Sequence, residues 1–120
     1  STKKAPSAIG PSSQAVLSGN TLYCSGQIAI NPETGDLVMD NITNETTQVM
    51  KNISEILKAA DMDFSNVVKC SIFMKSMDDY EEINKVYAMS FINNPPAREA
   101  VEVSALPKNV NVEISVIAVK

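Results

Sequence analysis

The most informative segment of this sequence is Val110-Asn-Val-Glu-Ile-Ser-Val-Ile-Ala-Val119. Every second residue from Val110 to Ala118 is apolar, which is the pattern of a β-strand with one face in a core. The intervening residues are polar at first and become apolar at Ile117 and Val119. A strand that is apolar on much of both faces favours a sheet whose second face meets another copy of the chain, so it indicates a homo-oligomer.

Turn-forming residues divide the rest of the chain into short segments. Gly and Pro predict a tight turn at Ile9–Pro11, and Ser18-Gly-Asn20 is a hairpin signal. A further turn is expected around Pro107–Asn109. Alternation and β-branched content predict four more strands, at Gln14–Leu17, Leu22–Gln27, Asn66–Met74 and Arg98–Ala105.

Two segments carry the periodicity of amphipathic helices. The first begins near Thr43, a candidate N-cap, and its apolar stripe runs from Val49 to Ala60. The second begins at Ser76 or Asp78 and is expected to end at the Asn-Asn-Pro-Pro segment at 93–96, because proline cannot continue the helical hydrogen bonds. Its core face is formed by Tyr80, Ile83, Tyr87 and Phe91.

The resulting order, β-β-α-β-α-β-β, predicts an α+β two-layer sandwich. Two amphipathic helices cover one face of a mixed sheet and leave the other face to solvent or to a partner. Neither a repeat nor a linker divides the sequence, so residues 1–120 are expected to form a single domain.

Composition excludes several classes of chemistry. The chain has no histidine, so it contains no His-based triad, His general base or His-ligated metal site. Its net charge of −4 argues against a nucleic-acid-binding surface. No cluster of Asp, Glu or Cys has ligand-like spacing, so no metal is expected. Cys24 and Cys70 are expected to be buried free thiols of a reducing compartment.

Location is suggested only by the lack of targeting patterns. No apolar run approaches the roughly 18 residues that span a bilayer, and no signal peptide is visible. We therefore expect a cytoplasmic protein without a membrane partner. Prior removal of an organelle-targeting segment is an alternative that the sequence leaves open.

Arg98 is the only arginine of the chain, and it follows two prolines at the start of a predicted strand. A guanidinium group binds a carboxylate or phosphate through two parallel hydrogen bonds. Arg98 is therefore a candidate substrate-binding residue. The alternative is a surface ion pair with Glu99 or Glu102.

Glu113 and Gly26 are two further candidates. Glu113 lies in an apolar strand, where burial would raise the pKa of its carboxyl group and a nearby cation would lower it. A carboxylate in this position can orient or deprotonate a water. The alternative is a solvent-facing strand residue. Gly26 interrupts a strand, which either lets a ligand approach the backbone or marks a bulge.

Several separated motifs have a familiar order and spacing. They are Ala5-Pro-Ser-Ala-Ile-Gly-Pro11, Ser25-Gly-Gln-Ile28, Asn84 with Tyr87, Pro96-Ala-Arg-Glu-Ala-Val-Glu-Val103, Leu106-Pro-Lys108, Val112-Glu-Ile114 and Ile117-Ala118. Together they resemble the RidA/YjgF family, also described as the endoribonuclease L-PSP family, over essentially the whole chain.

The resemblance implies a chorismate-mutase-like fold and a homotrimer with its sites in clefts between subunits. It implies hydrolysis of reactive 2-enamine and 2-imine acids, such as 2-aminoacrylate or 2-iminobutyrate, to 2-keto acids and ammonia, without cofactor or metal. Small 2-imino and 2-keto acids are then the expected partners. Two alternatives stay open: a non-catalytic trimer that binds small carboxylates or acts as a regulator or chaperone, and an endoribonuclease that inhibits translation.

The resemblance also assigns roles to individual residues. Arg98 matches the arginine that holds the substrate carboxylate, and Glu113 matches the glutamate that positions the attacking water. The resemblance therefore implies that Arg98 and Glu113 are the catalytic residues. The substrate-binding residues implied in this way are Ser25, Gly26, Asn84, Tyr87 and Ala100.

Two positions depart from the family pattern. Ser12 stands where many deaminating members have a tyrosine, so a bulky wall and a hydroxyl group of the expected pocket are missing. Ala100 stands where a cysteine is common, and that cysteine can contribute through its backbone.

Overall fold

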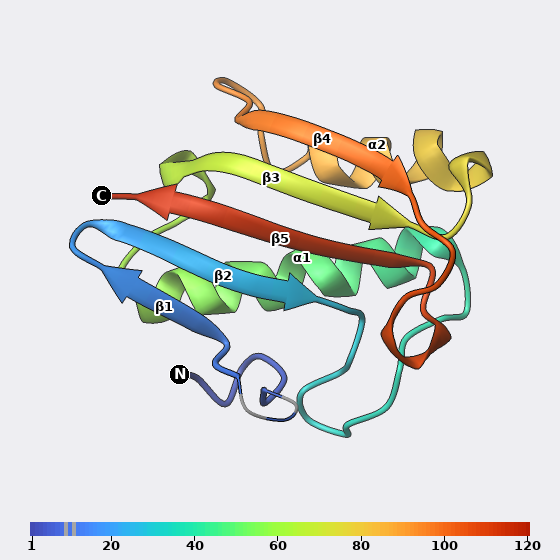
Figure 1. The fold of residues 1–120 in the computed structure, drawn as a ribbon, viewed down its shortest axis with the longest axis horizontal. Coiled ribbons are helices and arrows are strands. Elements are labelled where there is room, and N and C mark those ends of the chain that lie inside the picture. Colours follow the sequence, from blue (N-terminus) through green and yellow to red (C-terminus); the bar gives the residue numbers. More distant parts are fainter. Residues whose placement is uncertain (9, 11) are drawn as a thin grey trace.

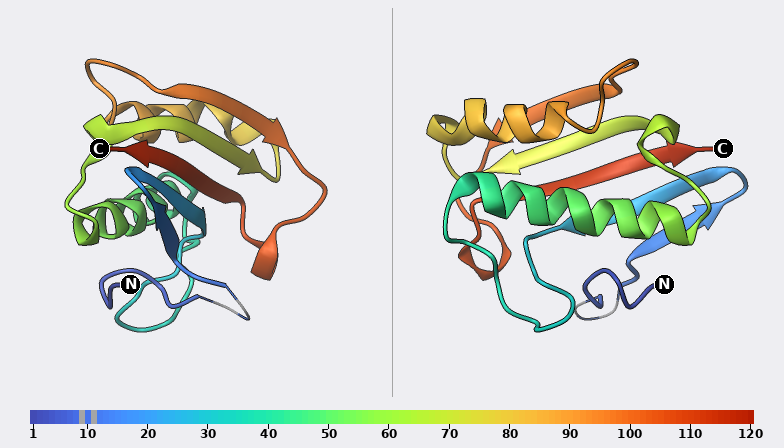
Figure 2. Two further views of the ribbon diagram at one scale, coloured as in Figure 1. Left: turned by 60° about the vertical axis from the view of Figure 1, so that its left-hand side comes forward. Right: turned by 180° about the vertical axis from the view of Figure 1, so that it is seen from behind.

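The computed structural model describes residues 1–8, 10 and 12–120, and in these residues five strands form one mixed sheet. Its order is β1-β2-β5-β3-β4, with β3 and β4 parallel and the other neighbours antiparallel. Two α-helices of the described residues lie on the same face of the sheet (Figures 1 and 2). The predicted α+β class and two-layer arrangement are confirmed. The strands are β1 (Ala15–Ser18), β2 (Thr21–Gln27), β3 (Val67–Met74), β4 (Ala97–Glu102) and β5 (Val112–Val119).

Helix α1 (Ile42–Ala59) begins slightly earlier than the sequence predicted. Its N-cap is Asn41, whose side-chain oxygen accepts a hydrogen bond from the backbone N–H of Asn44 at 2.8 Å. The prediction of Thr43 as N-cap was therefore wrong. Thr43 lies inside the first turn, where its hydroxyl group donates to Glu82 at 3.2 Å.

Helix α2 (Tyr80–Ala88) is shorter than the sequence predicted. Ser76 caps a 3₁₀ turn at Met77–Asp79, and the α-helix begins only after that turn. At its other end the N–H of Ser90 bonds to the carbonyl of Tyr87 at 3.1 Å, so the chain tightens into a 3₁₀-type turn before the prolines are reached.

Strands β4 and β5 are also shorter than the sequence patterns predicted. The connection between them contains a 3₁₀ turn at Pro107–Asn109, in which Lys108 and Asn109 both have a positive φ, of 55° and 57°. The predicted hairpin is present between β1 and β2, with Gly19 at φ 59°. The turn predicted at residues 9–11 falls partly outside the described residues.

The core lies between the sheet and the helices. It takes alternate residues of β5, namely Val112, Ile114, Val116 and Ala118, as the sequence predicted. The opposite face of the sheet carries no helix among the described residues, and several apolar side chains on it are open to solvent in a single chain. They include Val16 (55% exposed), Tyr23 (51%), Val101 (42%) and Val119 (37%).

Candidate active site

The two predicted catalytic residues lie on opposite faces of the sheet. Arg98 is next to the buried Cys70 in the β3–β4 register and its side chain turns toward α2. Glu113 is next to Phe73 in the β3–β5 register and lies on the face without helices. A single chain therefore forms two separate clusters, one around each residue.

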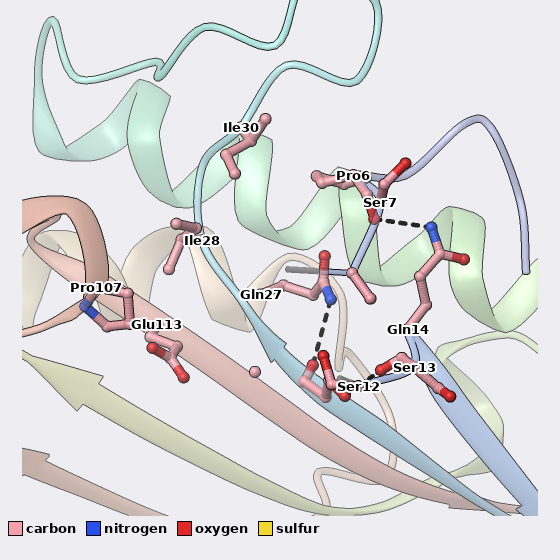
Figure 3. Close-up of a pocket in the computed structure, with 13 residues that line it drawn as sticks. Pro6, Ser7, Ser12, Ser13, Gln14, Gln27, Ile28, Ile30, Pro107 and Glu113 are labelled. Carbon is pink, nitrogen blue, oxygen red and sulfur yellow. Dashed lines mark hydrogen bonds between the residues drawn. The ribbon is translucent and has the colours of Figure 1, made fainter. Parts of the chain in front are cut away.

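Glu113 borders a cavity of about 320 Å³. The cavity lies between the N-terminal segment, the end of β2 and the start of β5 (Figure 3). It brings together three of the predicted site residues, Ser25, Gly26 and Glu113. The described residues that line it are Pro6, Ser7, Ala8, Ser12, Ser13, Gln14, Ser25, Gly26, Gln27, Ile28, Ile30, Pro107 and Glu113.

The Glu113 side chain lies directly against the backbone of Gly26. A Cβ atom built on Gly26 would be 2.8 Å from the Cδ of Glu113 and closer still to Oε2, so this position has no room for a side chain. The register between β2 and β5 shifts between Cys24 and Gln27, which confirms that Gly26 is part of a bulge. The bulge interpretation is therefore confirmed, and the group that approaches the backbone of Gly26 in this chain is the Glu113 carboxylate.

Burial raises the pKa of the Glu113 carboxyl group above its ordinary value. Its side chain is half-buried, and no hydrogen bond or ion pair with another described residue offsets the loss of solvent. A carboxylate in this state accepts a hydrogen bond from a water readily. This is the property that general-base catalysis needs.

Gln14 is a cavity residue that the sequence did not single out. Its side-chain amide donates to the carbonyls of Thr2, Ala5 and Pro6 at 2.9, 3.2 and 2.8 Å, and its oxygen accepts from the N–H of Thr2 at 2.8 Å. These four hydrogen bonds hold the N-terminal segment beside the cavity. Nothing in the sequence distinguishes this buried glutamine from an exposed one at the start of an edge strand.

Ser25 is held at the rim of the cavity by β1 and the residues before it. Its hydroxyl group donates to the carbonyl of Ser13 at 2.5 Å, and its N–H donates to the carbonyl of Gln14 at 2.9 Å. The side chain therefore contributes to the wall while already serving a structural hydrogen bond.

Asn52 of α1 fixes the opposite wall and was also missed. Its side chain is fully buried and donates to the carbonyls of Ile28 and Ile30, at 3.2 and 3.0 Å. Gln48, one turn earlier, donates to the Asn52 side-chain oxygen at 2.8 Å. The helix therefore sets the path of the chain as it leaves β2.

The second cluster surrounds Arg98. Its Nη1 donates to Oδ1 of Asn84 and its Nη2 donates to the hydroxyl oxygen of Tyr80 at 3.0 Å. The guanidinium carbon is 5.2 Å from the centre of the Tyr87 ring. The structure thus brings together Arg98, Asn84 and Tyr87, and Ala100 lies two residues further along the same face of β4.

The alternative interpretation of Arg98, a surface ion pair, is wrong. Glu99 pairs instead with Lys69 at 2.8 Å. The carboxylate of Glu102 accepts the backbone N–H of Met77 at 2.8 Å. Arg98 is half-buried and held by neutral partners, which leaves its positive charge available to an anion.

Two tyrosines in this cluster have opposite environments. Burial and the neighbouring Cys70 raise the pKa of the Tyr87 phenol, which is core as expected. Tyr80 was expected to be core but is half-buried, and a hydrogen bond with Asn84 and the charge of Arg98 lower the pKa of its phenol. Tyr80 lies 18 positions before Arg98 in the sequence, and no local pattern predicts that the two side chains meet.

The cysteines are both free and buried, as predicted. Burial raises the pKa of Cys24 to about 12, so its thiol stays protonated near neutral pH. Among the described residues, no group of three or more Cys, Asp or Glu side chains is placed to hold a metal ion. Likewise, none of the helices in the described part of the chain is long and apolar enough to cross a membrane.

Comparison with known proteins identifies the family. The family model described as Endoribonuclease L-PSP matches residues 2–120. The chain belongs to this family, that of RidA and YjgF. It is 48% identical over 120 residues to the human protein named 2-iminobutanoate/2-iminopropanoate deaminase, covering 100% of this chain and 88% of that one.

Solved structures of family members have the same fold. RidA from an Antarctic Psychrobacter species has a TM-score of 0.96 and 40% identity, with 100% of this chain and 97% of that chain covered. TdcF from E. coli with bound serine has a TM-score of 0.95 and 34% identity, covering 100% and 96%. The resemblance seen in the sequence motifs is thereby confirmed.

Proposed function

We propose that this protein hydrolyses reactive 2-enamine and 2-imine acids to 2-keto acids and ammonia. The observation that carries the proposal is the contact between Glu113 and Gly26, because it places an unpaired carboxylate of raised pKa against bare backbone in a cavity. Support comes from relatives named 2-iminobutanoate/2-iminopropanoate deaminase at 48% identity.

Arg98 is the proposed carboxylate-binding residue, and it comes from a neighbouring copy of the chain. Because Arg98 and Glu113 of one chain face away from each other across the sheet, one substrate needs them from two chains. The exposed apolar side chains on the face without helices favour such an assembly, which we take to be a homotrimer. The serine bound in the E. coli relative also carries a carboxylate.

The proposed reaction uses Glu113 as a proton carrier. After the enamine has tautomerised to the imine and solvent has protonated the imine nitrogen, Glu113 accepts a proton from water while the water oxygen bonds to C2 and the C=N π electrons move to nitrogen. Glu113 then returns its proton to the amine nitrogen of this adduct. As the C–N bond breaks, the adduct's hydroxyl group forms the carbonyl and releases its proton to solvent, which yields the keto acid and ammonia. General-base assistance of this kind contributes roughly 10²–10⁴-fold, and no metal or cofactor enters the scheme.

RNA cleavage receives less support from this chain than its family name suggests. The sequence has one arginine, no histidine and a net charge of −4, whereas RNA binding depends on cationic contacts to phosphates. The non-catalytic alternative, binding of small carboxylates, shares the Arg98 site with the proposed reaction. Only a measurement of turnover distinguishes this alternative from the proposed reaction.

The experiment is a coupled assay in which threonine dehydratase generates the imine from threonine and semicarbazide traps what is left. The wild-type protein should speed keto-acid release and lower the trapped fraction. Arg98→Ala should do neither, and Lys58→Ala, which removes a cation at an exposed site on α1, should behave like wild type.

Particle mass measured by light scattering shows whether each variant is assembled. An assembled wild-type protein that leaves imine decay unchanged would contradict the proposed function. Binding of 2-ketobutyrate by that inert protein would then establish the carboxylate-binding alternative.

A further inference from the structure

The cavity beside Glu113 extends well beyond the atoms that react. Its volume is about 320 Å³. One water occupies about 30 Å³ in the liquid, so the cavity has room for about ten groups of that size. The side chain of 2-iminopropanoate is a single methyl group, and that of 2-iminobutanoate is an ethyl group. Either would leave most of this space empty.

The wall of the cavity is suited to apolar atoms. Pro6, Ala8, Ile28, Ile30 and Pro107 all line it, and Figure 3 shows Ile28 on the same side of the cavity as Glu113, with Ile30 nearer Pro6. Among the lining residues that the structure describes, Glu113 alone is charged. A second anionic group on the substrate would therefore meet a like charge in this cavity, because Arg98 of the neighbouring copy already binds the substrate carboxylate.

Several polar side chains of the wall already have hydrogen-bond partners. Gln14 holds the N-terminal segment, Ser25 donates to Ser13, and the amide of Gln27 donates to the carbonyl of Ser25 at 3.4 Å. A polar substrate side chain would have to compete with these bonds. An apolar side chain would leave them intact and would gain from burial.

The apolar side of the cavity is also rigidly supported. Asn52 binds the carbonyls of both Ile28 and Ile30 from inside the core. Since the backbone is held at both residues, the cavity is not expected to collapse when it is empty, and a ligand does not have to order its wall.

We propose that this cavity is a side-chain pocket, and that the preferred substrates are 2-imino acids with a bulky, uncharged, apolar side chain such as isobutyl. The inference rests on the proposed function. C2 lies beside Glu113, the carboxylate points to Arg98 of the neighbouring copy, and the side chain packs against Ile28 and Ile30. Each additional buried methylene should raise kcat/KM about fourfold.

The test uses imines made by an amino-acid oxidase from alanine, 2-aminobutyrate and leucine, with catalase to remove peroxide and semicarbazide as the trap. The leucine-derived imine should be hydrolysed with a kcat/KM tenfold to a hundredfold above that of the alanine-derived imine, as expected for about three additional buried carbons. A kcat/KM that is flat or falls with side-chain length would overturn the inference.

Ser12→Tyr tests whether the cavity itself is the source of selectivity, because the larger side chain would fill space at the lining. The leucine-to-alanine ratio of kcat/KM should fall at least tenfold. Ser104→Tyr, the same change at an exposed position outside the cavity, should leave the ratio as in wild type. An unchanged ratio in Ser12→Tyr would count against the pocket.

Calorimetric binding of pyruvate and 4-methyl-2-oxopentanoate separates this inference from the proposed function. Tighter binding of the longer acid by a protein that hydrolyses none of the imines would support the pocket and refute the deaminase. Hydrolysis of all three imines at one rate, with equal binding of both acids, would support the deaminase and refute the pocket.

Discussion

Arg98 and Glu113 are separated by the sheet that carries them. Arg98 reaches Tyr80 and Asn84 of the helical layer, whereas Glu113 lies over Gly26 on the opposite face. Successive side chains along a strand point to opposite faces, and residues paired across neighbouring strands share a face. Arg98 pairs with Cys70 and Glu113 with Phe73, so this separation is built into the strand register. A site that uses both groups must therefore be shared between chains.

Subunit complementation follows from this arrangement. Arg98→Ala and Glu113→Gln should each be inactive alone, but co-expression of the two should restore activity, because some sites receive both intact residues. Random assembly in a ring predicts about a quarter of the wild-type activity. Co-expression of the Arg98→Ala/Glu113→Gln double variant with Arg98→Ala is the control and should remain inactive, and absence of rescue in verified mixed assemblies would refute a shared site.

Gly26→Ala should displace Glu113 and lower kcat by tenfold or more, with a loss of stability of about 1–3 kcal/mol from overpacking. The cause can be isolated in a double-mutant cycle with Glu113→Ala, measured by chemical denaturation. Without the carboxylate, the added methyl group should cost much less. Equal costs in both backgrounds would show that the contact with Glu113 is not the constraint.

Tyr80→Phe should raise KM about twofold to tenfold and change kcat little, since it removes one hydrogen bond that orients Arg98. Thr47→Val, the loss of a hydroxyl group at an exposed position of α1, is the control. KM and kcat of both variants are measured by steady-state kinetics and compared with those of wild type. A fall in kcat at constant KM would instead place the Tyr80 hydroxyl group in the chemical step.

The raised pKa of Glu113 predicts how both activity and stability depend on pH. The base form is lost as pH falls through the raised pKa, so the wild-type kcat/KM should have an acid limb above the ordinary carboxyl value of 4.5. The stability of the fold should change with pH in the opposite direction to the activity. The folded state binds this proton more tightly than the unfolded state, so ionised Glu113 destabilises the fold above its folded pKa.

Glu113→Gln should therefore be more stable than wild type at pH 7. The difference should shrink as pH falls through the folded pKa toward the ordinary value. Urea denaturation from pH 4 to pH 8 measures it. A variant less stable than wild type at pH 7 would show that an attractive interaction, rather than desolvation, governs this carboxylate.

Asn52→Ala should lower stability by about 1–3 kcal/mol, because the buried carbonyls of Ile28 and Ile30 lose a donor. It should also raise KM by loosening the cavity wall. Asn44→Ala on the exposed side of the same helix removes only a hydrogen bond to Asp40 and should change stability by less than about 0.5 kcal/mol. Equal effects of the two changes would contradict a special role for Asn52.

Local sequence patterns were sufficient to predict the helices, the strands and the fold class. The alternation from Val112 to Ala118 predicted the buried face of β5, and the spacing of apolar residues predicted α1, since both patterns reflect which side chains leave water. The predicted ends of the helices and strands were less accurate. Asn41 rather than Thr43 caps α1, because several polar residues stand together there and only the backbone geometry selects one.

The sequence by itself determined the α+β class, the family, and Arg98, Glu113 and Gly26 as candidates, because these depend on residue types and on order along the chain. The tertiary structure decided where those residues lie. Strand pairing separated Arg98 from Glu113 and laid Glu113 over Gly26. Long-range packing also placed Asn52 behind the cavity, a contact between residues more than twenty positions apart that no local pattern encodes.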